Sequence, residues 1–267
     1  MMELSGLSLA ITLGAYIYRR APRVTILSQR HRPLTWTEIT LADAQDELWR
    51  NFPYGAAASV ALSYRNQAQA VWPGTVRGLR TYGKDENEVS LLGPDGPLAA
   101  TRIQQAWENE TPEAIIRWAV GQAGLPLGRI DSPGVTLPRF VADDIPVYQV
   151  AERAAHSVQR AFDIDMSRWA LWLGADGVNW GDFEEAGDVP VIATGGGLIA
   201  HTPVDLPLAW GEVETFLLPD LTHSRTVRIQ DMRRGIDGTF RALRVRHEIT
   251  PASARTFVAY GDEHGRY

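Results

Sequence analysis

Hydrophobic and polar residues alternate most regularly in the last third of the chain. Between 243 and 249 an apolar set with one histidine interleaves with a charged set: Leu243, Val245, His247 and Ile249, and Arg244, Arg246 and Glu248. A period of two is the pattern of a strand with one buried face. We therefore expect a half-buried strand in which His247 packs inward and hydrogen-bonds a neighbouring strand or loop.

Further strands are predicted on both sides of this segment. A strand over 226–229 and a glycine turn over 234–238 precede it, and a strand over 256–260 follows a break at Pro251. The chain is thus expected to close on a small antiparallel β-module at 193–267.

Short apolar runs also fill the first part of the chain, with turn-forming residues between them. The predicted strands cover 23–27, 59–64, 70–72, 75–79 and 88–92. Five consecutive turn formers, at 93–97, end this run. Residues 1–104 are therefore predicted to form a first β-module of barrel or sandwich type.

The hydrophobic period lengthens to that of a helix in the middle of the chain. Thr111 suits the N-cap and Pro112 the first turn, after which apolar residues recur at helical spacing until Gly124. A second helix is predicted from Asp144 to about Val158.

A hairpin over 169–180, with its turn at 174–177, completes a predicted α/β module at 105–192. Residues 193–197 and 203–207 are expected to form a flexible link to the closing module. The predicted fold class is α+β, mainly β, with two β-modules flanking a compact α/β module.

Composition narrows the classes of function. The 267 residues are 45% apolar and 22% charged with a net charge of −6, which is ordinary for a folded protein and gives no global positive field for nucleic acid. The absence of cysteine excludes disulfides, thiolate zinc sites and cysteine nucleophiles. The apolar stretch 4–18 is too short to span a bilayer, and its basic pair, Arg19 and Arg20, follows it. We expect a strand or docking segment there and no membrane anchor.

No group of residues has the spacing of a known catalytic or metal site. The six histidines are isolated, without H-E-x-x-H spacing: His31, His156, His201, His223, His247 and His264. There is no G-x-S-x-G elbow, and the glycines at 195–197 lack the Lys-Ser/Thr of a phosphate loop. We therefore predict no catalytic residue, no cofactor and no metal.

Acids, tryptophans and arginines leave alternatives open. The acids concentrate at Asp163 and Asp165, and at Asp182, Glu184, Glu185 and Asp188. Such neighbours are usually solvated turn residues, but a cell-wall glycan hydrolase using Asp182 or Glu184 is one alternative.

Five tryptophans are expected to fill the α/β core, with a glycan-binding module as the other alternative: Trp107, Trp118, Trp169, Trp172 and Trp180. Seven arginines favour protein contact over nucleic-acid contact: Arg228, Arg233, Arg234, Arg241, Arg244, Arg246 and Arg255.

The order of these parts is similar to that of a known family. The matching segments are Trp72-Pro73-Gly74-Thr75-Val76, Thr111-Pro112-Glu113-Ala114-Ile115-Ile116 with Ala123-Gly124-Leu125, a second helix, a hairpin, and the module from Phe240 to His247. Together they resemble the late-control D family of phage baseplate hub proteins, which is related to the spike base of type VI secretion and other contractile injection systems.

The resemblance implies a structural protein and not an enzyme. It implies that both β-modules are small tail-tube-like barrels and that three copies form a pseudo-sixfold ring joining the tail tube to the central spike. The implied partners are other copies of the chain, a tail tube or distal tail protein, the spike protein and a tape-measure protein, with no sequence-specific nucleic acid. The implied location is the tail baseplate of a virion, after synthesis in the cytoplasm of the bacterial host.

Overall fold

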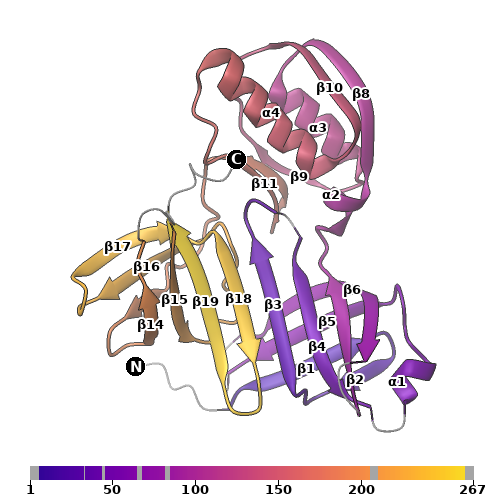
Figure 1. The fold of residues 1–267 in the computed structure, drawn as a ribbon, viewed down its shortest axis with the longest axis vertical. Coiled ribbons are helices and arrows are strands. Elements are labelled where there is room, and N and C mark those ends of the chain that lie inside the picture. Colours follow the sequence, from indigo (N-terminus) through magenta and orange to yellow (C-terminus); the bar gives the residue numbers. More distant parts are fainter. Residues whose placement is uncertain are drawn as a thin grey trace.

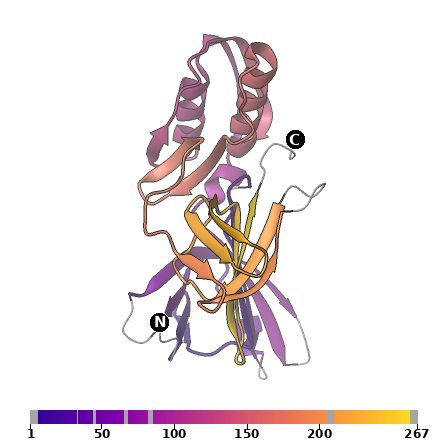
Figure 2. The same ribbon diagram turned by 90° about the vertical axis from the view of Figure 1, so that its left-hand side faces the viewer.

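The chain folds into two bodies stacked along its long axis. A computed structural model describes residues 6–32, 34–43, 46–64, 68–81, 85–204 and 210–261. Strands hold 52% of these residues and helices 15%, so the fold is α+β and mainly β, as predicted. Both ends of the chain build a broad β body, and the middle of the chain builds a smaller α/β body above it (Figures 1 and 2).

The β body is organised by one antiparallel sheet of eleven strands. From one end to the other these are β14 (Leu198–Thr202), β15 (Trp210–Phe216), β19 (Ala254–Gly261), β18 (Arg244–Ile249), β3 (Arg23–Gln29), β4 (Trp36–Ala42), β7 (Glu86–Leu92), β6 (Ala70–Thr81), β5 (Ala57–Ser63), β1 (Ser8–Leu13) and β2 (Tyr16–Tyr18). The predicted strands at 23–27, 59–64, 88–92, 243–249 and 256–260 fall within it. A short helix, α1 (Glu47–Arg50), lies outside the sheet.

The two ends of the chain share this sheet and do not form the two separate barrels that we expected. β18 pairs with β19 on one side and with β3 on the other, with His247 opposite Ile26. Among the described residues the sheet stays open, with β14 and β2 at its ends. Local alternation identifies a strand and its buried face but does not select a partner far away in the sequence.

A three-stranded sheet covers the C-terminal part of the large one. It contains β13 (Val191–Ala193), β16 (Thr226–Asp231) and β17 (Ile236–Arg241). β16 therefore pairs with β17, and after Ala242 the chain crosses into the large sheet, so the closing segment is divided between two sheets and is not the single antiparallel β-module we predicted. Residues 194–197, expected to be a flexible link, are a turn between β13 and β14. The link at 203–207 lies partly outside the described residues.

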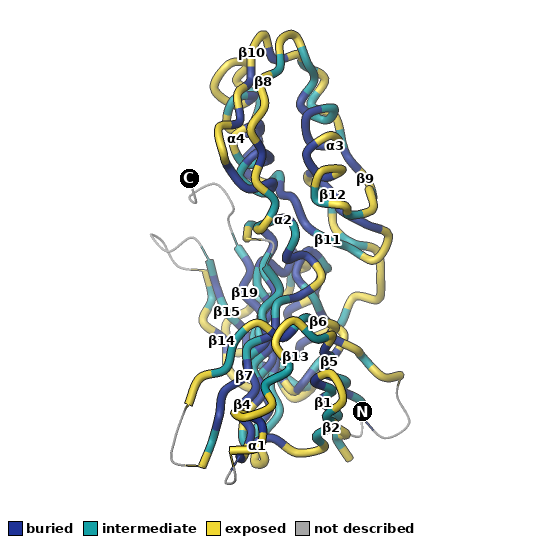
Figure 3. Tube along the Cα trace, turned by 90° about the vertical axis from the view of Figure 1, so that its right-hand side faces the viewer, coloured by how far each residue is buried: buried dark blue, intermediate teal, exposed yellow. Residues whose placement is uncertain are grey.

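The α/β body encloses its own hydrophobic cluster. Its elements are α2 (Gly96–Ala100), β8 (Arg102–Glu110), α3 (Pro112–Gln122), β9 (Leu127–Ile130), β10 (Leu137–Pro146), α4 (Val147–Phe162), β11 (Ala170–Gly174) and β12 (Gly177–Gly181). The cluster runs from Leu98 to Trp180, and two further clusters fill the halves of the β body. Figure 3 shows the buried residues inside both bodies and exposed residues on their loops.

The first of the two predicted helices, α3, begins and ends where the sequence predicts. The Thr111 side chain accepts a hydrogen bond from the backbone N–H of Ala114, Pro112 opens α3, and Gly124 follows its end with a φ of 67°. The predicted hairpin over 169–180 is also present as β11 and β12.

The second helix, α4, begins at Val147 and not at Asp144. Asp144 adopts a φ of 47° at an irregularity of β10, and Pro146 ends that strand. A proline disfavours helical backbone in the residue before it, so Ile145 stays extended. Within the described residues, neither this helix nor any other is long and apolar enough to cross a membrane.

Two local predictions were wrong at glycine-rich segments. The runs 70–72 and 75–79 form the single strand β6, because Gly74 allows the carbonyl of Leu92 to approach closely. The turn formers at 93–97 lead directly into α2. Burial raises the pKa of the Asp95 carboxyl in this turn, although it accepts hydrogen bonds from the backbone N–H and hydroxyl of Thr35.

The predicted faces of β18 are confirmed. Leu243, Val245, His247 and Ile249 are buried, whereas Arg244, Arg246 and Glu248 are partly exposed. The two ring nitrogens of His247 lie 2.9 Å from the hydroxyl of Thr256 and 3.0 Å from the carbonyl oxygen of Leu221. Because both nitrogens have partners, this fully buried histidine carries no unsatisfied polar atom.

Replacing His247 with alanine should destabilise the fold much more than replacing Arg244. The first change removes two buried hydrogen bonds and leaves a cavity, which costs about 1–3 kcal/mol. Arg244 pairs with Glu212 across 3.0 Å at a partly exposed site, where truncation costs less than about 1 kcal/mol. Thermal and urea unfolding of both variants check this. A neutral His247→Ala with a severe Arg244→Ala would show that the face is inverted.

Candidate functional site

The most unusual side chain of the β body is Arg30, directly after β3. Residues 24, 26 and 28 of this strand point into the core, and Arg30 continues the same phase with 0% of its surface exposed. An arginine is almost never fully buried unless its charge and its N–H groups have partners. This position therefore marks a built polar site.

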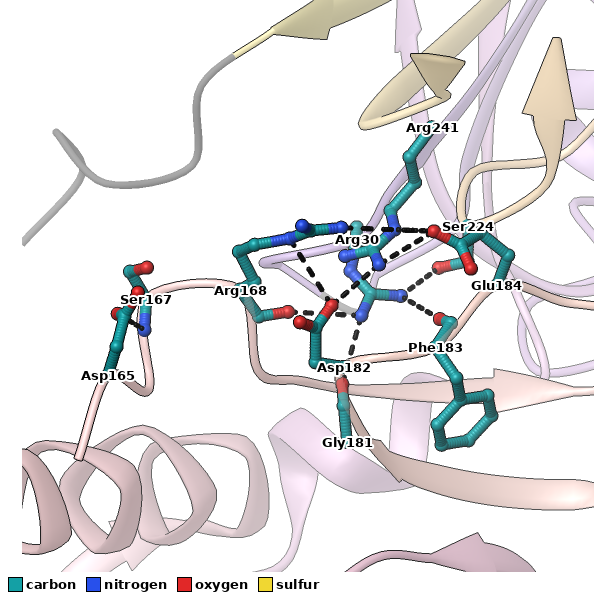
Figure 4. Close-up of polar contacts among 10 residues, drawn as sticks. All are labelled: Arg30, Asp165, Ser167, Arg168, Gly181, Asp182, Phe183, Glu184, Ser224 and Arg241. Atoms are coloured by element: carbon teal, nitrogen blue, oxygen red, sulfur yellow. Dashed lines mark hydrogen bonds and ion pairs between the residues drawn. The ribbon is translucent and has the colours of Figure 1, made fainter. Parts of the chain in front are cut away.

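The Arg30 guanidinium donates to acceptors from segments that are far apart in the sequence (Figure 4). The acceptors are Ser224 Oγ at 2.9 Å and the carbonyl oxygens of Gly181 at 2.9 Å, Arg168 at 3.1 Å and Phe183 at 3.2 Å. The cation also lies over the ring of Trp172, 4.3 Å from its centroid. We call these residues the Arg30 junction.

The junction joins both bodies through three stretches of chain. Arg30 comes from the end of β3, Gly181 from the end of β12 in the α/β body, and Ser224 from the loop before β16. The backbone N–H of Arg30 also donates to the carbonyl of Leu243, beside β18. The Arg30 side chain thus holds together the segment that leaves the α/β body after β12 and the loop that leads into β16 of the β body.

Ser224 and His223 form a buried polar pair beneath the guanidinium. Ser224 adopts a φ of 66°, and its Oγ lies 2.8 Å from Nδ1 of His223. Burial, and then the nearby positive charges of Arg30 and His31, lower the pKa of His223 to about 3. His223 is consequently neutral near pH 7, which keeps a second positive charge out of the site.

An ion-pair cluster lies next to the junction. Arg241, with 5% of its side chain exposed, pairs with Asp182 at 2.6 Å and Glu184 at 2.8 Å, and Arg168 pairs with Asp182 at 3.4 Å. Burial acts to raise the pKa of Glu184, but hydrogen bonding and the charge of Arg241 outweigh it and hold that pKa below its ordinary value. The Glu184 carboxylate is therefore charged near pH 7.

Asp182, Glu184 and Asp188 are exposed loop residues, as expected, but the fold also brings arginine partners to Asp182 and Glu184, and Glu185 is half-buried beside the junction. Trp172 donates from its indole N–H to the Glu185 carboxylate across 3.1 Å, and the Glu185 N–H donates to the Ser224 carbonyl. Burial raises the pKa of Glu185. The backbone carbonyl of Asp188 accepts from Arg225. Asp163 and Asp165 serve local turns after α4: Asp163 has a φ of 54°, and Asp165 accepts from the N–H of Ser167.

A second buried polar network holds β14 to the neighbouring strands. Nδ1 of His201 lies 2.8 Å from Oδ2 of Asp231, and its Nε2 lies 2.6 Å from the Tyr260 hydroxyl. Burial acts to raise the pKa of Asp231, but hydrogen bonds from His201 and Arg234 hold it at about 2. The three side chains are nearly inaccessible to solvent, so they cross-link strands and do not face a substrate.

The remaining candidates from the sequence, the other histidines and the tryptophans, do not come together in one site among the described residues. Within the described residues no three His, Asp or Glu side chains come together as a possible metal site, and His264 lies outside them. Of the tryptophans, Trp180 is buried in the α/β cluster and Trp107 and Trp169 pack partly against it, but Trp118 is 40% exposed and Trp172 belongs to the junction.

Most arginines of the closing segment are neutralised within the chain. Their carboxylate partners are Asp237 for Arg228, Asp231 for Arg234, Glu212 for Arg244, Glu248 for Arg246 and Glu214 for Arg255. The surface formed by these arginines is therefore one of ion pairs within the chain. Arg241 does not belong to it, because its side chain is buried.

The sequence contained a signal for Arg30 that we did not use. In 23–30, the buried positions Val24, Ile26 and Ser28 alternate with partly buried ones, and Arg30 occupies the buried phase. A charged residue in that phase indicates a buried polar site. Nothing local in the sequence marks His201 or Asp231 in the same way.

Comparison with known proteins identifies the fold. The sequence matches no protein-family model and no curated protein. In structure it is similar to a tail protein from Neisseria meningitidis, with a TM-score of 0.66, 13% identity and 96% of this chain and 97% of the other covered. It is equally similar to the 43 kDa tail protein of prophage MuSo2 from Shewanella oneidensis, with a TM-score of 0.66, 10% identity and coverage of 97% and 98%.

A component of the type VI secretion system of Escherichia coli, described as similar to bacteriophage T4 tail proteins, matches with a TM-score of 0.62, 10% identity and coverage of 92% and 75%. The chain therefore has the fold of phage tail proteins and of type VI secretion components. The resemblance inferred from the sequence is confirmed at the level of fold.

Replacing Arg30 with methionine should strongly destabilise the protein. Methionine fills much of the volume but leaves the Ser224 hydroxyl and three carbonyls without their donor, at a cost of about 3 kcal/mol or more. Arg168→Met is the matched control, because that side chain is 47% exposed and its ion pairs contribute less than about 1 kcal/mol. Urea unfolding measures both. Equal losses would contradict a central role for Arg30.

Acid should weaken the fold between about pH 6.5 and 4 through its buried histidines. Burial lowers the pKa of His247 to about 4 and that of His223 to about 3, from an ordinary 6.5. The unfolded chain therefore binds protons first, and stability is lost as the pH falls. Glu185 and Glu152 have raised pKa values and act in the opposite sense.

The contribution of His247 to this pH dependence is measured by comparing the wild type with a variant that lacks the histidine. The unfolding free energy of His247→Gln should depend less steeply on pH in this window than that of the wild type. Denaturant titrations from pH 7.5 to 4 measure both slopes. Identical slopes would show that His247 does not contribute.

Proposed function

We propose that the chain is a structural protein of a phage tail or phage-like injection particle, and specifically the baseplate hub that joins the tail tube to the central spike. The observation that carries this proposal is the match of fold over 96–97% of the chain to two tail proteins. The similarity to a type VI secretion component supports the same role, because that match also covers nearly the whole chain.

The chemistry of the junction supports assembly and not catalysis. Asp182 and Glu184, the acids considered for glycan hydrolysis, are both engaged by Arg241 and Arg168. A general acid for glycoside hydrolysis needs a raised pKa, whereas that of Glu184 is lowered. The exposed Trp118 packs edge-on against Trp107 and does not extend a flat platform for sugars.

The proposed organisation has three modules at 1–104, 105–192 and 193–267. The two β-modules are tail-tube-like units that share one sheet, and three copies of the chain would supply six such units to a sixfold tube. The sheet ends at the short strands β14 and β2, whose free edges a closed ring would cover. In this arrangement the partners are two further copies of the chain, a tail tube or distal tail protein, the spike protein and a tape-measure protein. The location is the tail baseplate of the virion, after synthesis in the bacterial cytoplasm.

Assembled particles should contain the chain as a ring of three between tube and spike. Electron-microscopy images of wild-type tails measure the symmetry and position, and particles assembled without the chain should lack the joint. Ile17→Asp, at a 66% exposed position on edge strand β2, should reduce its incorporation. Met232→Asp, at an 81% exposed position, is the control. A ring with twofold or sixfold symmetry of this chain would refute the proposal.

A further inference from the structure

A groove on the α/β body has no role in the junction. Two open hollows of about 380 and 440 Å³ lie along α4, one beside β10 and the other beside the loop after β3. Arg139 and Arg153 line the first, Arg32 lines the second, and Glu152 lines both. The two hollows meet at Glu152, and together we call them the α4 groove.

The three arginines of the groove differ from most others in the protein. All three are exposed, and none forms an ion pair with a carboxylate among the described residues. Arginines on the rest of the surface, such as Arg228 and Arg244, mostly lie within 4 Å of an acid of the same chain. The groove therefore presents three positive charges that form no ion pair within the described part of the chain.

Glu152 interrupts this charge at the centre of the groove. Its side chain is partly buried, and burial raises its pKa while the charge of Arg32 opposes that rise. Leu34, Tyr148 and Phe140 add apolar surface to the lining. The lining thus alternates along its length: cationic at Arg139 and Arg153, acidic at Glu152, and cationic again at Arg32.

We propose that the α4 groove binds an extended acidic segment of a neighbouring protein, with carboxylates at both ends of the groove and an uncharged residue over Glu152. Guanidinium groups bind carboxylates through paired N–H donors, which favours this occupant. A nucleic-acid strand carries a charge at every phosphate and would meet Glu152 at close range. That the neighbour is another component of the particle rests on the proposed hub function, whereas the charge pattern does not.

Binding of a synthetic peptide to the full chain tests the proposal. The probe is a fluorescein-labelled octapeptide of alternating glutamate and leucine, and its glutamine–leucine counterpart is the control peptide. Fluorescence anisotropy at pH 7.5 and low salt should show binding of the acidic peptide alone. The double variant Arg139→Gln/Arg153→Gln should weaken it at least about tenfold, and Glu152→Gln should strengthen it about threefold. Arg77→Gln, at an exposed arginine on β6, should leave it unchanged.

Several outcomes would overturn this proposal without touching the hub assignment. They are equal binding of the neutral peptide, unchanged binding by the double variant, and weaker binding by Glu152→Gln. Tighter binding of a labelled single-stranded oligonucleotide, lost in the same double variant, would identify nucleic acid as the occupant. Self-association of the wild type that the double variant abolishes would identify a second copy of the chain. Failure of the particle experiment, conversely, would leave a positive peptide result in place.

Discussion

The arrangement of the two bodies depends on one buried cation. Removing a guanidinium from water is very costly, and the cost is tolerable only where its donors and its charge are matched. Arg30 achieves this at its two terminal nitrogens, which donate to a serine hydroxyl and three backbone carbonyls, and its charge lies over the face of Trp172. Since carbonyls cannot move without their backbone, the same contacts hold the ends of β3 and β12 and the loop before β16 in one geometry.

The groups around the junction are tuned to that charge. His223 stays neutral because burial and Arg30 lower its pKa, and Glu184 stays ionised because Arg241 outweighs its burial. A second histidine, His247, is likewise neutral and bonded at both nitrogens in the β body. The interior therefore uses polar side chains as fixed cross-links between distant segments. Such cross-links fix the relative positions of distant segments of the chain.

The sequence predicts what depends on neighbours along the chain. The buried phase of β18 follows from its alternation, and the ends of α3 follow from Thr111 and Gly124. Pairing of β3 with β18 joins residues more than 200 positions apart and has no local signature. The same limit hid the partners of Asp182 and Glu184, because a loop acid reads as solvated until the fold brings Arg241 against it. The sequence could have predicted that α4 begins after Pro146, because a proline disfavours helical backbone in the residue before it, here Ile145.

Arginine serves three purposes here, and its surroundings decide which. Arg30, fully buried, donates from both terminal nitrogens to acceptors of the same chain and acts as a structural centre. Arg228 and Arg244, on the surface, each form an ion pair with an acid of the same chain, so their charge is neutralised and attracts a partner only weakly. Arg139, Arg153 and Arg32 are also exposed, but among the described residues none of them is ion-paired, and the hollows beside them contain one carboxylate, that of Glu152. What distinguishes the α4 groove is the combination of three arginines without an ion pair and two hollows along one helix, because an exposed arginine on a flat surface offers a partner charge but no recess to bind in.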